Sequence, residues 1–149
     1  MASSIKRWAV VALVGAFVLV WRAETSQDVA AAQARRPIMM TRIYTGPDGL
    51  SHAEEIEMRL NGNVSEMMKA TGVEFSRRPP APVSDWHVGP RRQFVITLSG
   101  RAEIEVAGGK KVAIGSGHIN LIEDTIGKGH TTRNIGPDDR IVVTIPLAN

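Results

Sequence analysis

The sequence predicts an all-β domain, an antiparallel sandwich or barrel of about eight to ten short strands. Three observations support this fold class. Short runs of residues alternate between apolar and polar, as half-buried strands do. Turns that contain glycine separate these runs. Little of the chain has the apolar spacing of a helix. Periodicity alone does not distinguish a sandwich from a barrel.

The N-terminal segment has the composition of a secretory signal. Lys6 and Arg7 precede an uncharged apolar run over residues 8–21. A membrane-spanning helix needs about 20 apolar residues, so this run is short for an anchor and has the length of a signal core.

A small-x-small cleavage site at residues 32–34 would leave Arg35 as the first residue of the mature chain. We therefore expect a signal peptide or N-terminal anchor over residues 1–34 and a single domain over residues 35–149. Cleavage predicts a periplasmic or secreted protein. The alternatives are a membrane anchor through residues 8–21 and a cytoplasmic protein.

The first half of the domain is predicted to consist mainly of strands. Residues 38–45 form a strand that ends at the turn sequence Gly-Pro-Asp-Gly. In residues 52–60, Ile56, Met58 and Leu60 alternate with charged residues, which predicts a half-buried strand. The remaining elements predicted here are a short helix over 65–70, a strand over 71–77 and a loop at Pro79, Pro80 and Pro82.

The second half contains a predicted strand over residues 86–100 that presents His87 and Gln93 on one face. A later strand begins at His130, so two strands would direct imidazoles into the mouth of a small barrel. The other strands predicted in this half are 101–106, 111–114, 118–124 and 140–147, all joined by turns that contain glycine.

Composition excludes several classes of function. The chain has no cysteine, which rules out disulfides, thiolate catalysis and thiolate metal ligands. It carries 18 Lys and Arg against 15 Asp and Glu, a small excess. The arginine pairs are scattered and lack interleaved aromatic residues, so we expect no nucleic-acid partner.

The residues around His87 have the spacing of a known motif. Six residues separate Gln93 from Gly100, as they separate glutamate from glycine in that motif, and His87 stands at its first histidine. Three positions depart from the pattern: Gly89 replaces the second histidine, Gln93 the glutamate and Ala81 the leading glycine.

The residues around His130 match a second motif. Gly127, His130 and Asn134 have its glycine, histidine and asparagine spacing. Thr125 replaces its proline, and Gly117 lies two residues farther upstream than its first glycine.

On these motifs, the chain resembles the cupin superfamily over about residues 38–147. The resemblance implies a jelly-roll β-barrel. In family members three histidines and a glutamate hold one divalent ion (Fe, Mn, Zn, Ni or Cu). Carried over by position, the ligands here would be His87, Gln93 and His130. This neutral set leaves the charge of the ion uncompensated, so a weak metal site and a metal-free polar pair both stay open.

Several neighbouring residues are further candidates. Strand parity allows only one of Glu123 and Asp124 to face inward; Asp124 would be a carboxylate ligand, or it would accept hydrogen bonds from the following glycine turn. Arg91 would clamp an anion or lie in solvent. Trp86 would stack on a ligand or fill space, and Asn134 would orient a ligand or stabilise a turn.

The resemblance supports no particular reaction, because one fold carries many activities. We expect an exported cupin-domain protein that binds, or both binds and transforms, a small molecule in the barrel mouth, with His87 and His130 as acid–base groups. The alternative is a non-catalytic, metal-free module that binds a sugar or a carboxylate. Apolar residues on both faces of residues 94–98 would be explained by a homodimer, formed when an outer sheet packs against a second subunit.

Overall fold

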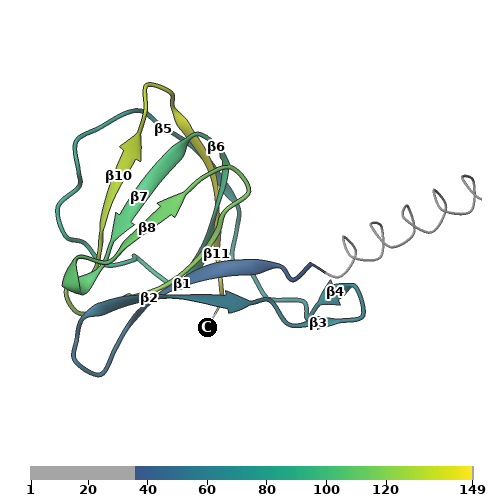
Figure 1. The fold of residues 1–149 in the computed structure, drawn as a ribbon. Helices are drawn as coiled ribbons and strands as arrows, with labels where there is room; N and C mark the ends of the chain where they lie inside the picture. Colours follow the sequence, from purple (N-terminus) through teal and green to yellow (C-terminus); the bar gives the residue numbers. More distant parts are fainter. Residues whose placement is uncertain (1–35, 149) are drawn as a thin grey trace, which may run out of the picture. The chain divides into compact units, whose positions relative to one another are not determined.

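The computed structural model describes residues 36–148, which are strand and loop apart from one short 3₁₀ turn (Figure 1). No α-helix occurs in this range, so none of its segments is a helix that could cross a membrane. The all-β prediction is therefore confirmed. The predictions for residues 1–34 fall outside the described residues.

The larger of two facing sheets has six strands in the order β2-β1-β9-β6-β11-β5 (Figure 1). Strands β1 and β9 are parallel, and every other neighbouring pair is antiparallel. The expectation of a purely antiparallel fold is wrong at this pair, because a long crossover brings the chain back to the same end of the sheet. The strands are β1 (Met39–Thr45), β2 (Ser51–Glu57), β5 (Glu74–Arg78), β6 (Gln93–Ser99), β9 (Ile119–Glu123) and β11 (Arg140–Pro146).

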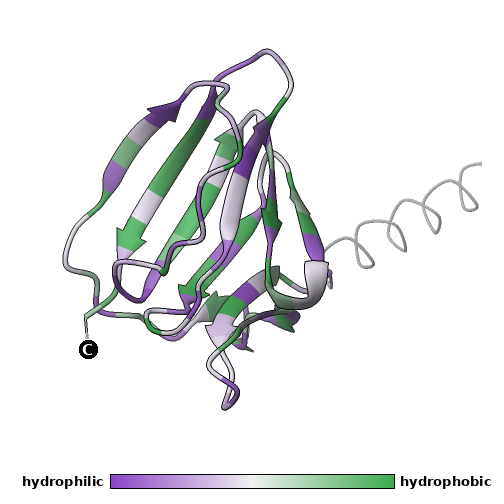
Figure 2. Cartoon of the chain, turned by 90° about the vertical axis from the view of Figure 1, so that its left-hand side faces the viewer, coloured by the Kyte–Doolittle hydropathy of each residue, from purple (hydrophilic) through white to green (hydrophobic). Residues whose placement is uncertain are grey.

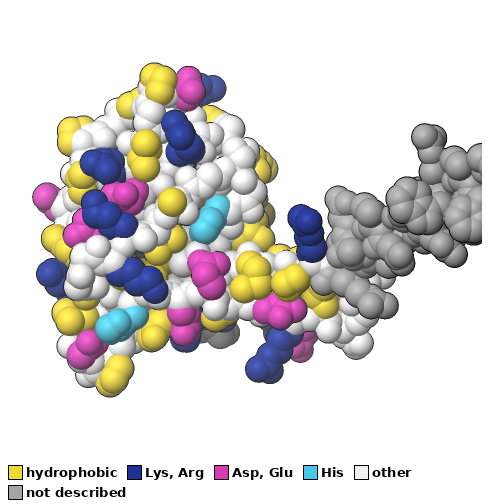
Figure 3. Space-filling view, in the orientation of Figure 1, with side chains coloured by type: hydrophobic (Ala, Val, Ile, Leu, Met, Phe, Trp, Pro, Cys, Tyr) yellow, Lys and Arg dark blue, Asp and Glu magenta, His cyan; other side chains and the backbone are white. Residues whose placement is uncertain are grey.

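The smaller sheet has three antiparallel strands in the order β10-β7-β8. Its solvent face carries ion pairs: Glu103 lies 3.0 Å from Lys111 and 3.2 Å from Arg133. Figure 3 shows basic and acidic side chains interspersed on this side of the molecule. The elements are β10 (Thr131–Ile135), β7 (Arg101–Glu105), β8 (Lys111–Ile114) and the 3₁₀ turn η1 (Ala107–Gly109) between β7 and β8.

The main core lies between the two sheets. Polar and apolar residues alternate along the strands, as Figure 2 shows, so each strand directs one set of side chains inward. Burial of each valine or isoleucine in this core contributes roughly 1.5–3 kcal/mol, and each alanine contributes less. The six-stranded sheet contributes Ile43, Ala53, Val95, Ile122 and Val142, and the smaller sheet contributes Ala102, Ile104, Val106 and Ile114.

A second apolar cluster covers part of the outer face of the six-stranded sheet. Met40, Phe94, Leu121 and Leu147 are buried there. The chain around residues 58–71 is tied to this sheet by a bridge from Ala70 to Leu147. The described chain alone therefore buries Phe94, which is 7% exposed, on one face of β6 and Val95 on the other. The homodimer stays a prediction.

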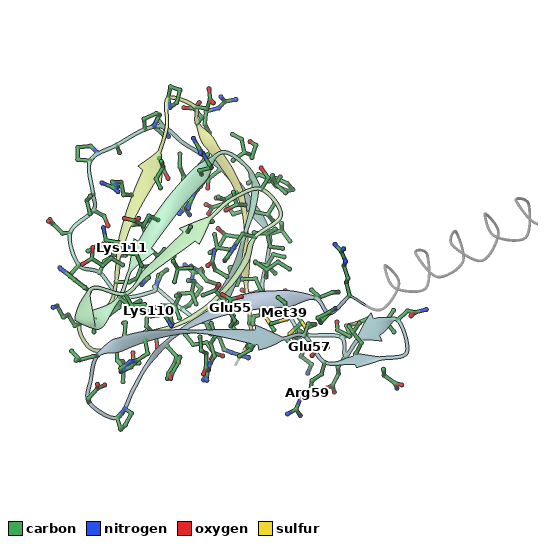
Figure 4. The ribbon with its side chains drawn as sticks, in the orientation of Figure 1. Met39, Glu55, Glu57, Arg59, Lys110 and Lys111 are labelled. Atoms are coloured by element: carbon green, nitrogen blue, oxygen red, sulfur yellow. The ribbon has the colours of Figure 1, made fainter. Side chains whose placement is uncertain are left out.

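The two sheets are not joined into a closed barrel by continuous strand pairing within residues 36–148. Side chains bridge the gaps instead. On one side Nζ of Lys110 donates to the carbonyl of Ala53, 2.6 Å away. Lys110, Lys111 and Glu55 line a shallow hollow at this opening (Figure 4). On the other side Nδ2 of Asn134 donates to the carbonyl of Pro79 at 2.7 Å.

Two predicted elements differ from the structure. The helix over residues 65–70 is wrong: the two-stranded hairpin β3 (Leu60–Asn61) and β4 (Val64–Ser65) precedes an extended segment. Met67 is 95% exposed, so this segment has no apolar stripe to bury as a helix. The strand predicted from residue 86 begins only at Gln93, because Pro90 cannot donate to a sheet.

Candidate functional site

A cavity of about 180 Å³ lies between the two sheets. It is smaller than the roughly 300–1,000 Å³ of pockets for drug-sized ligands, so it suits a small molecule. Both sheets and the loop before β6 contribute to its wall. The lining residues are Arg78, His87, Gly89, Pro90, Gln93, Val95, Ile104, Ile114, Asn120, Ile122, His130, Thr132 and Arg140.

His87 and His130 lie side by side at this cavity. Their backbones form an antiparallel bridge in which each N–H donates to the carbonyl of the other residue, at 3.0 and 2.9 Å. Their ring centroids are 4.6 Å apart. Gly129 permits this approach: its φ is +77°, and a Cβ there would lie 2.0 Å from the carbonyl oxygen of His87.

A buried carboxylate orients the ring of His130. Nδ1 of His130 lies 2.7 Å from Oδ2 of Asp124, which also accepts a hydrogen bond from Oγ of Ser51 at 2.8 Å. Asp124 is wholly buried. An ionised carboxylate only accepts, so Nδ1 of His130 carries a proton and Nε2 is left for other contacts.

His87 is held in the same tautomer by the backbone. Its Nδ1 lies 2.9 Å from the carbonyl oxygen of Asp85, which can only accept a hydrogen bond. The hydroxyl of Ser84 is 3.3 Å from the same nitrogen. Nε2 is therefore the unprotonated nitrogen in each neutral ring of the histidine pair.

The pair Glu123 and Asp124 divides as strand parity requires. Asp124 faces inward, where its Oδ2 accepts hydrogen bonds from Nδ1 of His130 and Oγ of Ser51. Glu123 faces outward and accepts from Nε of both Arg42 and Arg92, at 2.5 Å each. Although burial opposes it, hydrogen bonding to Arg92 and Arg42 holds the pKa of Glu123 below its usual value.

The other predicted site residues divide between the cavity and the surface. Gln93 is buried and lines the cavity. Arg91 is exposed and lines a separate hollow beside Pro146. Trp86 is 38% exposed, and its ring centroid lies 4.1 Å from Nζ of Lys128. Asn134 lies within β10, not in a turn, and its Nδ2 donates to the carbonyls of Arg78 and Pro79.

The cavity also contains polar residues that sequence analysis did not single out. Arg140 begins β11 and is 2% exposed. Arg78, its cross-strand partner at the end of β5, lines the cavity with it. The sequence contained one indication that Arg140 is buried: it stands two residues before the apolar Val142, so both side chains lie on the same face of the strand. A charged residue at a strand end is usually solvent-exposed, so the signal is weak.

The residues present do not fit a resident divalent metal. Within residues 36–148 no three histidine or carboxylate side chains lie close enough together to hold an ion. A Cβ at Gly89 would lie 2.4 Å from Cγ2 of Ile122, so the position of the missing histidine has no room for a side chain. The described lining contains two arginines and no Asp or Glu, which disfavours a cation.

Comparisons with known proteins identify no family. No family model matches the chain, and no curated protein matches it. Among solved structures, the chain is similar to the crystal structure of protein NMB1881 from Neisseria meningitidis, with a TM-score of 0.40 and 18% sequence identity. The match covers 56% of this chain and 81% of that chain.

Proposed function

We propose that residues 36–148 form a cupin-type domain that binds a small molecule in the cavity between its two sheets, with His130 as the acid–base group. One observation carries the proposal: an imidazole at the cavity wall is oriented by a wholly buried carboxylate. Such a pairing fixes the tautomer and the direction of the ring, which acid–base chemistry requires.

The proposed roles follow from the hydrogen bonds. Nε2 of His130 accepts a proton from the ligand or returns one, while Asp124 stabilises the imidazolium that forms. His87 supplies a second imidazole whose ring centroid is 4.6 Å from that of His130. The amide of Gln93, at the start of β6, can donate and accept hydrogen bonds and orients the ligand.

This chemistry uses no metal, since the donor set does not fit one. Elemental analysis of full-length protein purified without a chelator tests this point. About one transition-metal ion per chain, lost in His130→Ala, would contradict it and restore the divalent-metal prediction.

We also propose that the protein is exported and forms a homodimer. Support for export lies in the sequence of residues 1–34, and support for a dimer lies in the exposed apolar side chains Leu98, at 49%, and Phe75, at 70%. N-terminal sequencing of the exported protein should begin at Arg35. Intact Met1 in the membrane fraction would contradict cleavage, and a monomeric mass by light scattering would contradict the dimer.

A thermal-shift screen of small organic acids and sugars tests the binding proposal. A ligand that raises the Tm of the wild-type chain should do so less in His130→Ala and His87→Ala. The matched control is His52→Ala, because His52 interacts with Asp48 and does not line the cavity. Equal stabilisation of all four proteins would contradict the proposed site.

Product analysis then separates the two functional classes. A ligand changed by the wild type and returned unchanged by a folded His130→Ala variant would support the acid–base role. A ligand that binds and is recovered unchanged from the wild type would instead support a non-catalytic binding module.

A further inference from the structure

The arginine at the start of β11 differs from the arginines on the surface. Arg77 lies 2.7 Å from a carboxylate oxygen of Asp139, and Arg92 lies 2.5 Å from one of Glu123. Arg140 is 2% exposed, yet its Nε and Nη1 donate to no acceptor within residues 36–148. A buried guanidinium without a carboxylate is costly, so an anion in contact with it would be stabilised.

A second guanidinium lies beside the first. Arg78 and Arg140 face each other across the β5–β11 pair, and both line the cavity. Burial, with the adjacent charge of Arg78, lowers the pKa of Arg140 to about 10. Burial also lowers the pKa of Arg78, and the charge of Glu74 only partly opposes this. The two guanidinium groups repel each other, and an anion bound between them would offset this repulsion.

Hydroxyl and amide groups on the same inward face are likewise without partners. Oγ1 of Thr97, Oγ1 of Thr144 and Oδ1 of Asn120 are buried and make no hydrogen bond within the described chain. Buried polar groups in folded proteins nearly always have a partner. Of these three residues Asn120 lines the cavity, where its amide carbonyl can accept from a hydroxyl of the ligand.

Arg140 and the amide of Gln93 lie near opposite ends of β6. The backbone of Ile141, beside Arg140, pairs with Ser99, the last residue of β6, whereas Gln93 is the first residue and pairs with Ile122. Apolar side chains line the cavity along with these polar groups: Val95, Ile104, Ile114 and Ile122. This wall suits a ligand with a short apolar body.

We infer that Arg140 and Arg78 bind the carboxylate of a small organic acid, which directs the rest of the acid along the apolar wall toward His87 and His130. The inference rests on the proposed function and names the class of its ligand. A planar guanidinium matches a carboxylate through two parallel N–H···O bonds, which a neutral amide cannot reproduce. This inference places the anion clamp inside the cavity, at Arg140 and Arg78; Arg91, the clamp predicted from the sequence, lines the adjoining hollow.

Acids and their neutral isosteres test the inference. Binding of propionate, butyrate and isobutyrate to the full-length protein is compared with binding of the three corresponding primary amides, by thermal shift and calorimetry at constant ionic strength. We expect the acids to raise the Tm and the amides to bind about 10- to 100-fold more weakly. Amides that bind as well as the acids, or acids that have no effect on the wild type, would overturn the inference.

Variants locate the binding group. Arg140→Met and Arg78→Met should each weaken acid binding about 10- to 100-fold, and Arg140→Lys should lose less because it keeps a charge. Arg77→Met is the matched control, since Arg77 is adjacent in β5 and pairs with Asp139 at the surface. Wild-type affinity in a folded Arg140→Met variant would overturn the assignment.

Two further comparisons separate this inference from the proposed function. Acid binding that survives in His130→Ala but disappears in Arg140→Met supports the carboxylate site even if no turnover is found. Binding of acids and amides alike that depends on His130 and not on Arg140 overturns the inference and leaves the proposed function intact. Inorganic phosphate is titrated in parallel, and stabilisation by phosphate without stabilisation by the acids would overturn the choice of carboxylate.

Discussion

Nδ1 of His130 lies 2.7 Å from Oδ2 of Asp124, a carboxylate with no exposed surface. Asp124 follows β9 directly, and His130 stands immediately before β10, so one short connection carries both partners. Ser51, the first residue of β2, donates a second hydrogen bond to the same oxygen. This three-residue network connects the interior of the larger sheet with the imidazole at the cavity.

Asp124→Asn should remove the orienting charge with almost no change in volume. The variant should lose about 1–3 kcal/mol of unfolding free energy, because the hydrogen bonds from His130 and Ser51 lose their charge assistance and the new amide nitrogen, at the position of Oδ1, has no acceptor in the described chain. Urea denaturation at pH 7 measures this loss. Asp48→Asn is the control, since Asp48 pairs with His52 at the surface. Equal stability of the two variants would show that the buried network contributes nothing.

Arg140→Met should stabilise the ligand-free protein. The pKa of Arg140 falls to about 10 in the folded protein, first because its guanidinium is buried and second because the charge of Arg78 is adjacent; methionine, of similar length, avoids both penalties. We expect a higher denaturation midpoint for the variant, with weaker acid binding. A loss of stability would show that Arg140 has a favourable partner in the folded protein.

The gain from Arg140→Met should depend on pH in a defined direction. The pKa of Arg140 is lower in the folded state, so below pH 10 both states are charged and the full penalty is present. Above this pH the folded state releases its proton first, and the penalty shrinks as the pH rises toward the ordinary pKa of arginine. The stability difference between variant and wild type should therefore be smaller at pH 11 than at pH 8. A stability difference that does not change with pH would show that it arises from packing and not from the charge of Arg140.

Glu123→Gln should destabilise the protein at neutral pH and have little effect in acid. The pKa of Glu123 is lowered in the folded state, so its contribution is present above the unfolded value and is lost as the pH falls through the folded value. Chemical denaturation at pH 7 and at pH 3 measures the change. Glu57→Gln is the control, since Glu57 has no ion pair within the described chain.

Gly129→Ala should disrupt the histidine pair. Its Cβ would lie 2.0 Å from the carbonyl oxygen of His87, in addition to the strain of a φ of +77°. Gly117→Ala is a matched control, because its φ is +79° and its Cβ would meet nothing within 4 Å. Backbone strain should cost both variants about 1–2 kcal/mol of unfolding free energy, and the clash with His87 should add a further loss in Gly129→Ala only. Equal losses in thermal denaturation would contradict a close approach.

Sequence patterns predicted most strands of the described domain to within two or three residues, because a period of two and a terminal glycine are local properties. The strand over residues 111–114 matches β8. Patterns did not predict the parallel pair of β1 and β9, since alternation specifies which face of a strand is buried but not which strand is its neighbour. The helix expected over residues 65–70 is absent; the segment has no apolar stripe to bury, and Ala70 instead bridges Leu147, which is distant in the sequence.

From its sequence alone this chain is a cysteine-free, strand-rich domain with histidines at positions 87 and 130 in a recognisable spacing. Only the tertiary structure brings those two rings within 4.6 Å of each other and sets Asp124 against one of them. It also places Arg140 in the interior. The physical reason is that burial and charge pairing depend on distances between residues far apart in the chain, which local periodicity does not contain.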